Sequence, residues 1–310
     1  MMNKILITGI SGFVGTNLVN YFKVNESFVL YGLDIVTESI VGVEKIYAWD
    51  EIDTIKDIDI VIHLAGKAHD TQNTSSDSVY FDVNLGLTKK IYEWYLNSSS
   101  TQFYMMSSVK AVVDTANGIV TEEVDPSPLT AYGRSKYEAE RFLNSLNLPS
   151  DKKLYIFRPC MIHGPNNKGN LNLLYKVVSK SIPWPLGAYK NRRSFLSVCN
   201  LCFIFNKFIA ISPQSGLYNL ADDVPVSTND LIRLIGLANN KKTIILNIPR
   251  FLIMILANIG DFFRLPLDSE RLKKLTEDYI VSNEKLLIAL GEELPVSSRD
   301  GLMSTLKSFK

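Results

Sequence analysis

A tyrosine and a lysine stand four residues apart in the stretch TAYGRSKYEAE, residues 130–140. Four residues make about one helical turn, so Tyr132 and Lys136 share one face of a helix if this stretch is helical. On one face, the ammonium would bias the ionisation of the phenol, which suits a pair that moves a proton. Roughly one Tyr-x-x-x-Lys is expected by chance in a chain of this composition. The pair therefore has weight only if the rest of the sequence supplies something for it to act on.

Length and charge narrow the class of partner. The 310 residues suffice for one large α/β unit or two modest domains, and 33 basic against 32 acidic residues leave a net charge of +1. Such a balance gives no net positive potential that would attract nucleic acid or an anionic membrane, so we expect a small-molecule partner and no nucleic acid. The N-terminus lacks the features of a signal peptide, which predicts a cytoplasmic location.

The cysteines and histidines do not predict a metal site. Cys160, Cys199 and Cys202 are too few for a disulfide framework. Cys199 and Cys202 have the spacing of a zinc pair, but the sequence offers no second pair and apolar residues flank them. We therefore expect buried thiols and no metal.

Short apolar runs recur through the first half of the chain, as in strands buried on both faces of a parallel sheet. These runs are KILIT, SFVLYGLD, KIYAW, IDIVIHLA, QFYMMSS and KLYIFRP. Helical patterns at about 13–23, 77–98 and 131–146 separate several of them. The alternation predicts an α/β, doubly wound parallel sheet with right-handed crossovers.

Three glycines follow the first predicted strand in TGISGFVG, namely Gly9, Gly12 and Gly15. At the start of a helix, this spacing leaves backbone N–H groups and the positive helix end free to receive a dinucleotide pyrophosphate. The alternative is a tight turn without a ligand. Asp34, at the end of the second predicted strand, favours the ligand because a carboxylate there accepts hydrogen bonds from the adenosine ribose. It also repels a 2′-phosphate, so we expect NAD rather than NADP.

Five motifs in register resemble one known family. TGISGFVG, HLAG at 63–66, SS at 107–108, YGRSK at 132–136 and RPCMIHGP at 158–165 are similar, in order and spacing, to those of extended short-chain dehydrogenases/reductases of the nucleotide-sugar epimerase/dehydratase group. The resemblance implies a Rossmann-like NAD-binding domain of residues 1–165, to which about 193–220 return. The remainder of 166–310 would form a smaller, mostly helical lobe that binds the nucleotide sugar.

The same resemblance assigns catalytic roles. Tyr132 would be the acid/base, Lys136 would hold the nicotinamide ribose and lower the phenol pKa, and Ser108 would hydrogen-bond the substrate oxygen. A free tyrosine titrates near pH 10, so work near neutrality needs about 4 kcal/mol of electrostatic help. Lys136 and the oxidised nicotinamide are the positive charges that would supply it.

Further site residues follow from matched positions, and several have ordinary alternatives. Asp50 equally suits an exposed loop, Asn84 resembles an active-site asparagine or a solvent-facing helix residue, and Ser107 serves either the cofactor or the backbone. The expected substrate-binding residues are Ser108, Asn170, Arg193 and Arg271. The expected cofactor-binding residues are Gly9, Gly12, Phe13, Val14, Gly15, Asp34, Asp50, Leu64, Ala65, Gly66, Ser107, Tyr132, Lys136 and Pro159.

Some positions depart from the family pattern. His163 stands where tyrosine is usual and Asn200 where aspartate is usual, and SSVKAVVDTANG replaces the usual segment after the serines. A packed or hydrogen-bonded His163 is the commoner outcome, whereas contact with cofactor or substrate is the alternative. The role of Lys110 stays open.

Three hypotheses for the function are compatible with the resemblance, which favours the first of them. The first is reduction at C4 of a UDP-4-keto-6-deoxy-N-acetylhexosamine in polysaccharide biosynthesis, and the second is 4-epimerisation of a UDP-hexose or UDP-N-acetylhexosamine. A dehydratase is disfavoured because no acidic residue follows Ser108. The third hypothesis is a non-catalytic dinucleotide-binding scaffold.

Two expectations concern surfaces. Family precedent suggests a homodimer through the helices at 77–98 and 131–146. The apolar stretch RFLIMILANIGDFF, residues 250–263, is shorter than the about 20 residues that a helix needs to span a bilayer. We expect a buried or interfacial helix there, with peripheral membrane attachment as the alternative.

Overall fold

The computed structural model describes residues 2–24, 27–68, 76–167, 170–263 and 268–309. Its centre is a seven-stranded parallel sheet in the order β10-β7-β5-β4-β1-β2-β3. The strands are β1 (Asn3–Thr8), β2 (Phe28–Leu33), β3 (Lys45–Tyr47), β4 (Ile60–His63), β5 (Gln102–Met106), β7 (Lys153–Pro159) and β10 (Gly216–Leu220). The order reverses direction between β1 and β4, which is the switch point of a doubly wound fold. The predicted fold class and all six predicted strands are confirmed.

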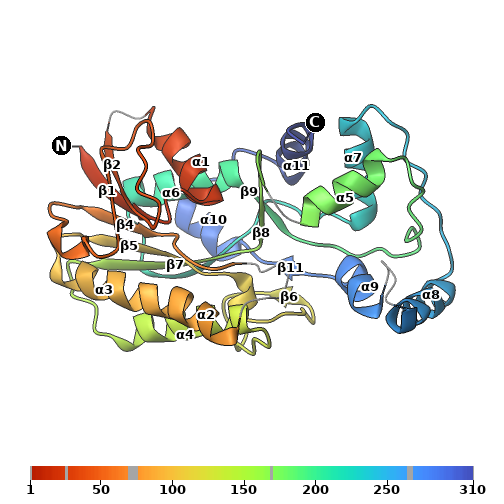
Figure 1. The fold of residues 1–310 in the computed structure, drawn as a ribbon, viewed down its shortest axis with the longest axis horizontal. Helices are drawn as coiled ribbons and strands as arrows, with labels where there is room; N and C mark the ends of the chain where they lie inside the picture. The colour runs from red at the N-terminus through yellow and green to blue at the C-terminus, as the bar shows by residue number, and fades with distance from the viewer. Residues whose placement is uncertain (1, 25–26, 69–75, 168–169, 264–267, 310) are drawn as a thin grey trace.

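Helices cover both faces of this sheet (Figure 1). On one face lie α1 (Phe13–Phe22), α6 (Val198–Ile211) and α10 (Glu284–Leu290), and on the other lie α2 (Asp77–Phe81), α3 (Leu87–Asn97) and α4 (Ala131–Ser145). The central strand β4 is buried at every position because both of its faces are covered. That coverage explains the unbroken apolar runs in the sequence.

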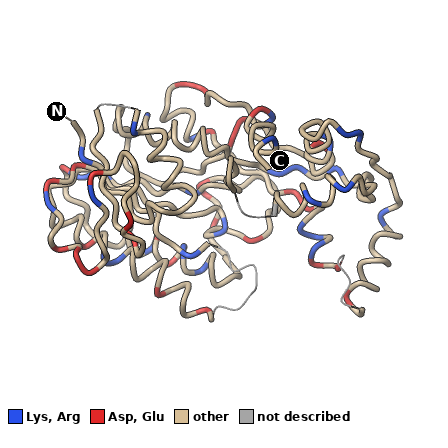
Figure 2. Tube along the Cα trace, turned by 45° about the horizontal axis from the view of Figure 1, so that its top comes forward, with Lys and Arg blue, Asp and Glu red and all other residues tan. Residues whose placement is uncertain are grey.

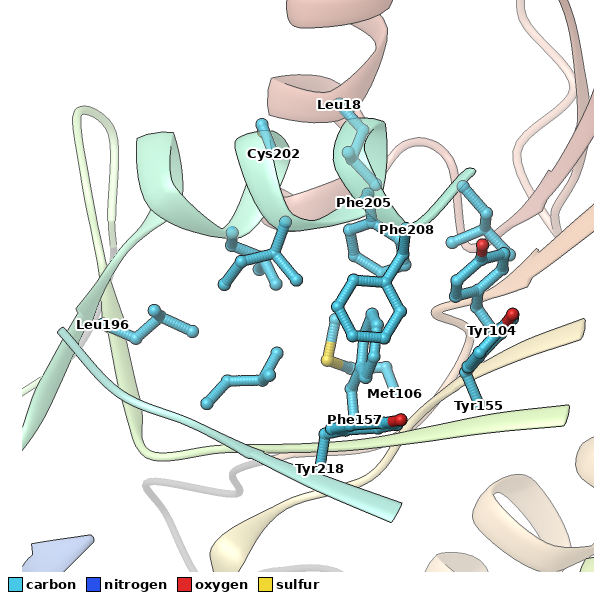
Figure 3. Close-up of a cluster of buried hydrophobic side chains, with 14 of the residues drawn as sticks. Leu18, Tyr104, Met106, Tyr155, Phe157, Leu196, Cys202, Phe205, Phe208 and Tyr218 are labelled. Carbon is cyan, nitrogen blue, oxygen red and sulfur yellow. The ribbon is translucent and has the colours of Figure 1, made fainter. Parts of the chain in front are cut away.

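Aromatic side chains fill the core between the sheet and α6 (Figure 3). Phe157 of β7 packs edge-on against Phe205 and Phe208 of α6, with ring centroids 5.2 and 5.0 Å apart. Tyr104 of β5 stacks on Tyr155 of β7 at 4.7 Å. This core fixes the carboxyl ends of β5 and β7, from which several candidate site residues extend.

The predicted helix at 77–98 is divided into three pieces. A π-helical turn, η2 (Asp82–Gly86), separates α2 from α3. Its extra residue turns Asn84 inward, where the side chain is completely buried. Asn84 is therefore not the solvent-facing residue that one alternative allowed.

Two short strand pairs and a helical lobe complete the fold. β6 (Ile119–Val120) pairs with β11 (Ile280–Val281), and β8 (Met161–His163) pairs with β9 (Phe195–Ser197). The helices of the lobe are α5 (Asn170–Ser179), α7 (Thr228–Ala238), α8 (Arg250–Phe263), α9 (Ser269–Thr276) and α11 (Ser298–Lys307). The lobe has its own hydrophobic cluster, built largely on α5, α7 and α11. The predicted domain boundaries stay a prediction.

Helix α8 occupies all of the apolar stretch at 250–263. Only Ile253, Ala257 and Gly260 of this helix are buried, so it is not the buried helix that one expectation described. Among the described residues, no helix is both long and apolar enough to cross a membrane.

Candidate active site

The glycine-rich loop connects β1 to α1 and depends on two glycines in particular. Gly9 has φ +67°, and a Cβ there would lie 2.8 Å from the Cα of Ala65. A Cβ on Gly15 would lie 2.5 Å from the carbonyl oxygen of Ile10. Gly12 is the N-cap of α1, whose first turn has no acidic side chain. The loop thus brings backbone close to backbone and leaves the helix end open to an anion.

Asp34 holds this loop from the end of β2. Its Oδ2 accepts hydrogen bonds from the backbone N–H of Ser11 (2.9 Å) and from the Ser11 hydroxyl (2.7 Å), and its Oδ1 accepts from the N–H of Ile35 (2.7 Å). A carboxylate has about four acceptor positions, so about one is left for a ribose hydroxyl. Sequence reasoning identified Asp34 but missed Ser11, whose signal was a small polar residue inside the glycine loop.

The loop after β4 lies against α4 because Asn84 connects them. The amide of Asn84 donates to Ser135 Oγ (2.9 Å) and to the Lys67 carbonyl (3.1 Å), while its Oδ1 accepts from the Lys67 N–H (2.8 Å). A Cβ on Gly66 would lie 2.9 Å from both Asn84 Oδ1 and Lys136 Nζ. The missing side chain at Gly66 therefore keeps open a space beside the candidate lysine.

Tyr132, Ser108 and Lys136 come together at the carboxyl edge of the sheet. Tyr132 and Lys136 lie in the first turns of α4, as predicted, and Ser108 follows β5. A hydrogen bond joins Tyr132 to Ser108, and Lys136 Nζ donates to the Met106 carbonyl at 2.9 Å. The structure thus assembles the three predicted catalytic side chains, while their roles stay a prediction.

Burial dominates the pKa of the phenol and of the lysine in this structure. Burial raises the pKa of Tyr132 above its ordinary value, the hydrogen bond with Ser108 lowers it in part, and Tyr80 raises it. Burial also lowers the pKa of Lys136 to about 8, although Glu140 acts in the opposite direction. The predicted lowering of the phenol pKa by Lys136 together with oxidised nicotinamide stays a prediction. In this structure the lysine ammonium is directed to the Met106 carbonyl.

The start of α4 is positioned by residues that sequence reasoning did not single out. Thr130 caps the helix by accepting from the Gly133 N–H at 3.1 Å, and Asp114 accepts from the Thr130 N–H and hydroxyl, both at 3.1 Å. A Cβ on Gly133 would lie 2.4 Å from the Lys110 carbonyl. Gly133 therefore lets Tyr132 approach the turn η3 (Val109–Ala111), which begins at Ser108.

A buried ion pair locks α4 to the ends of two strands. Arg158 of β7 donates from Nε to the carboxylate of Glu140 at 3.0 and 3.2 Å, and the Ser107 hydroxyl donates to the same carboxylate. Glu140 and Arg158 are almost completely buried. The Ser107 hydroxyl thus bonds to a buried side chain and not to the backbone, and its cofactor role stays a prediction.

Other predicted cofactor residues line the same edge without a distinctive contact. Phe13, Val14 and Leu64 are partly buried against the core, and Pro159 ends β7. Asp50 lies exposed in a turn after β3. Their cofactor roles stay predictions.

The predicted substrate residues lie toward the lobe. The backbone of Arg193 pairs with Val226, and its guanidinium donates to the Lys274 carbonyl at the end of α9. Arg271 is exposed on α9 beside Asp268, with 3.5 Å between Nε and Oδ2. Asn170 begins α5, but its side chain lies outside the described residues.

The charge of Arg193 acts on the side chain of Lys110. Its Nζ lies 4.6 Å from the centre of the Tyr279 ring. Burial lowers the pKa of Lys110, Asp114 opposes this shift, and the positive charge of Arg193 adds to it. Burial also lowers the pKa of Arg193. Lys110 and Arg193 are thus two partly desolvated cations, and the negative charge of Glu277 acts on both of them.

His163 is a packed residue. It is completely buried, its Nδ1 lies 2.9 Å from the Thr305 hydroxyl, and its Nε2 lies 3.7 Å from Asp222 Oδ2. Asn200 also bonds to Asp222, at 2.7 Å. Cys160 and Cys202 are buried and Cys199 is exposed, so the expectation of buried thiols is wrong for Cys199.

The chain shares its fold with enzymes of known structure. The chain is similar to the solved structure of a UDP-glucose 4-epimerase from Thermotoga maritima, with a TM-score of 0.76 and 17% identity over 99% of this chain and 98% of that one. The shared class is a Rossmann-like fold with a C-terminal lobe. The profile of the NAD dependent epimerase/dehydratase family matches residues 5–221, and the chain belongs to that family.

Sequence relatives of the chain include epimerases and reductases. It is 28% identical to a UDP-glucose 4-epimerase of Vibrio cholerae, over all of this chain and 96% of that protein. It is 23% identical to a GDP-6-deoxy-D-mannose reductase of Pseudomonas aeruginosa, over 76% of this chain and 80% of that protein. The protein is an enzyme of this family, and its activity is NAD-dependent and acts at C4 of a nucleotide sugar.

The residues of the site fit NAD. Gly9 and Gly15 permit close backbone approach, Gly66 leaves space next to Lys136, and Asp34 retains an acceptor position at the end of β2. These features match the pyrophosphate, nicotinamide and adenosine ends of a dinucleotide.

Proposed function

We propose that the protein reduces the C4 keto group of a UDP-4-keto-6-deoxy-N-acetylhexosamine. The observation that carries this proposal is a buried phenol hydrogen-bonded to Ser108 at the carboxyl edge of the sheet. Burial raises the pKa of Tyr132 and so keeps its proton available, and the bond with Ser108 opposes this shift only in part. Reduction of a ketone requires a proton donor at the carbonyl oxygen. NADH, when bound, supplies the hydride and carries no positive nicotinamide charge that would ionise the phenol.

Each residue then has one task in the reaction. Ser108 orients the keto oxygen, Tyr132 donates its proton to that oxygen as the alcohol forms, and Lys136 holds the nicotinamide ribose. The ammonium of Lys136 also stabilises the phenolate that remains until the proton is replaced from solvent. The group lies at the carboxyl edge of the parallel sheet, where α/β proteins place their ligands.

The substrate diphosphate would bind between η3 and the lobe. Arg193 offers a planar guanidinium suited to phosphate oxygens, and Lys110 adds a second partly desolvated cation. UDP as the nucleotide, a cytoplasmic location and a homodimer through α3 and α4 are part of this proposal.

A 4-epimerase is the second candidate, favoured by the relative from Vibrio cholerae that matches the whole chain. An epimerase would use the same side chains, but Tyr132 would first accept a proton from the sugar hydroxyl. That step requires an ionised phenol, and the positive charge of oxidised nicotinamide would have to lower its pKa. A dehydratase lacks support because valine and lysine follow Ser108.

Substitution of the phenol tests the catalytic assignment. Tyr132→Phe keeps the ring but removes the proton donor, so we expect turnover to fall by roughly 10²–10⁴-fold while the NADH dissociation constant is unchanged. Tyr137→Phe, on the same helix, is the matched control and should retain full turnover. Full turnover in Tyr132→Phe would exclude the proposed role and favour a non-catalytic scaffold if the biological function also persisted.

A further inference from the structure

Tyr279 is a buried tyrosine that the proposed reaction does not use. It lies in the short segment between α9 and β11, and 4% of its surface is exposed. The β6–β11 pair lies at the junction of the central sheet and the lobe (Figure 1). Basic and acidic residues both occur on each side of this junction (Figure 2), so no attraction between oppositely charged halves holds it together. Direct contacts such as those of Tyr279 must do so.

The hydroxyl of Tyr279 contacts the turn that begins at Ser108. It donates to the Val113 carbonyl at 2.7 Å, and the Val109 carbonyl lies 3.3 Å from the same oxygen. A phenol has one proton to donate, and the shorter distance assigns it mainly to Val113. Because Val109 begins η3 and Val113 lies just beyond its end, a single hydroxyl spans the turn.

This turn has Ser108 at its start and Asp114 just after its end. The Ser108 hydroxyl accepts a hydrogen bond from the N–H of Lys110 at 3.2 Å, so its placement depends on the shape of η3. Asp114 holds Thr130, the N-cap of the helix that carries Tyr132. The turn therefore sets the relative placement of Ser108 and Tyr132.

The ring of Tyr279 makes a second contact with the same turn. Lys110 Nζ lies 4.6 Å from the centre of the ring, within the range of a cation–π contact. The same ammonium donates to the Asp114 carbonyl at 2.5 Å. Substitution of Tyr279 by phenylalanine would keep the ring contact and remove the hydroxyl alone, so the two contributions can be separated.

The backbone of Tyr279 pairs with the segment that carries Arg193. Its N–H donates to the Arg192 carbonyl at 2.8 Å, and its carbonyl accepts from the Ser194 N–H at 2.9 Å. Tyr279 thus joins the segment expected to bind the substrate diphosphate to the turn that begins at Ser108. Since these bonds do not involve the side chain, substitution by phenylalanine should leave the Arg193 segment in place.

We propose that Tyr279 is a positioning residue that fixes Ser108 against Tyr132 from the junction with the lobe. This role rests on the proposed catalytic functions of those two side chains, but not on the direction of the reaction. Without the Tyr279 hydroxyl, the Val113 carbonyl loses its donor and the turn gains freedom. A displacement of about 1 Å between reacting groups can lower a rate about a hundredfold, so the loss should appear in kcat although Tyr279 acts only through other residues.

Amide hydrogen exchange tests the contact without any assumption about the reaction. In Tyr279→Phe with NADH bound, the amides of residues 111–113 should exchange at least about tenfold faster than in the unmodified chain. Tyr218→Phe is the matched control, because Tyr218 is also buried and its hydroxyl donates to the backbone carbonyl of Gln214 at 2.7 Å. Gln214 precedes β10, at the opposite edge of the sheet from the candidate site, so the control should leave this exchange unchanged.

Steady-state kinetics test the consequence for catalysis. Tyr279→Phe should lower kcat about ten- to a hundredfold and change KM for the nucleotide sugar less than about twofold, since the Arg193 segment stays paired. Tyr218→Phe should lose as much in Tm and keep full kcat. In a Ser108→Ala background, Tyr279→Phe should lower kcat less than about twofold, because the hydroxyl that it places is already absent.

Turnover is followed in whichever reaction the protein performs, ketone reduction with NADH or interconversion of UDP-hexosamines, so failure of the reductase proposal leaves this test intact. The positioning role is overturned if exchange at residues 111–113 is unchanged in Tyr279→Phe, or if its kcat is no lower than that of Tyr218→Phe. An equal loss of kcat with and without Ser108→Ala also overturns it, because Tyr279 would then act elsewhere.

Discussion

Removal of Arg158 should lower the free energy of unfolding far more than removal of an arginine from an exposed ion pair. Arg158→Met leaves the Glu140 carboxylate almost completely buried, with the Ser107 hydroxyl as its remaining partner among the contacts described above. Breaking one partner of a buried pair costs about 3–5 kcal/mol. At roughly 2–4 °C per kcal/mol for a chain of this size, Tm should fall by about 6–20 °C.

Thermal and urea unfolding of a matched set would measure this effect. Arg141→Met is the control, because Arg141 pairs with Glu138 at 2.9 Å on the exposed side of the same helix, and such pairs contribute below about 1 kcal/mol. The double variant Glu140→Gln/Arg158→Met removes both charges and should recover at least about half of the loss. A loss in Arg158→Met no larger than in Arg141→Met would refute the reasoning, and so would a double variant less stable than Arg158→Met.

Three further predictions concern the cofactor site. Burial lowers the pKa of Lys136 to about 8, so the ammonium is present below that pH. NADH binding should therefore weaken by up to about tenfold per pH unit above pH 8. Lys136→Met should flatten this pH profile of binding, and a profile unchanged by the substitution would contradict the assignment. Gly66→Ala should weaken NADH binding by about tenfold, since the new Cβ would lie 2.9 Å from Lys136 Nζ, whereas Gly86→Ala, whose nearest atom would be 3.9 Å away, should bind normally. Asp34→Ala should raise the affinity for NADPH relative to NADH by about tenfold or more, and an unchanged ratio would remove Asp34 from cofactor selection.

Much of the fold follows from sequence because parallel strands and crossover helices have strong local signatures. The apolar run IDIVIHLA predicted β4, and the spacing of Tyr132 and Lys136 predicted one helix face. Gly9 and Gly15 were recognisable because only glycine tolerates the close backbone approach after β1. Motif order then placed Ser108 beside Tyr132.

The remainder depended on contacts between residues distant in sequence. No local pattern indicated that Glu140 pairs with Arg158, or that a π-helical turn directs Asn84 inward to Ser135. The direction of the Lys136 side chain and the burial that raises the pKa of Tyr132 are likewise tertiary properties that no local pattern indicates. The exposure of α8 was equally inaccessible, since an apolar helix is usually buried.

The central claim is that the protein reduces a keto sugar, and the most direct measurement follows the near-ultraviolet absorbance of NADH with UDP-4-keto-6-deoxy-N-acetylhexosamine. The proposal predicts loss of NADH in a one-to-one ratio with the alcohol formed. A parallel product assay with UDP-hexosamines and no added cofactor supplies the opposing outcome. Interconversion of those sugars with no net change in cofactor, and no NADH loss with the keto sugar, would contradict the reductase and identify a 4-epimerase.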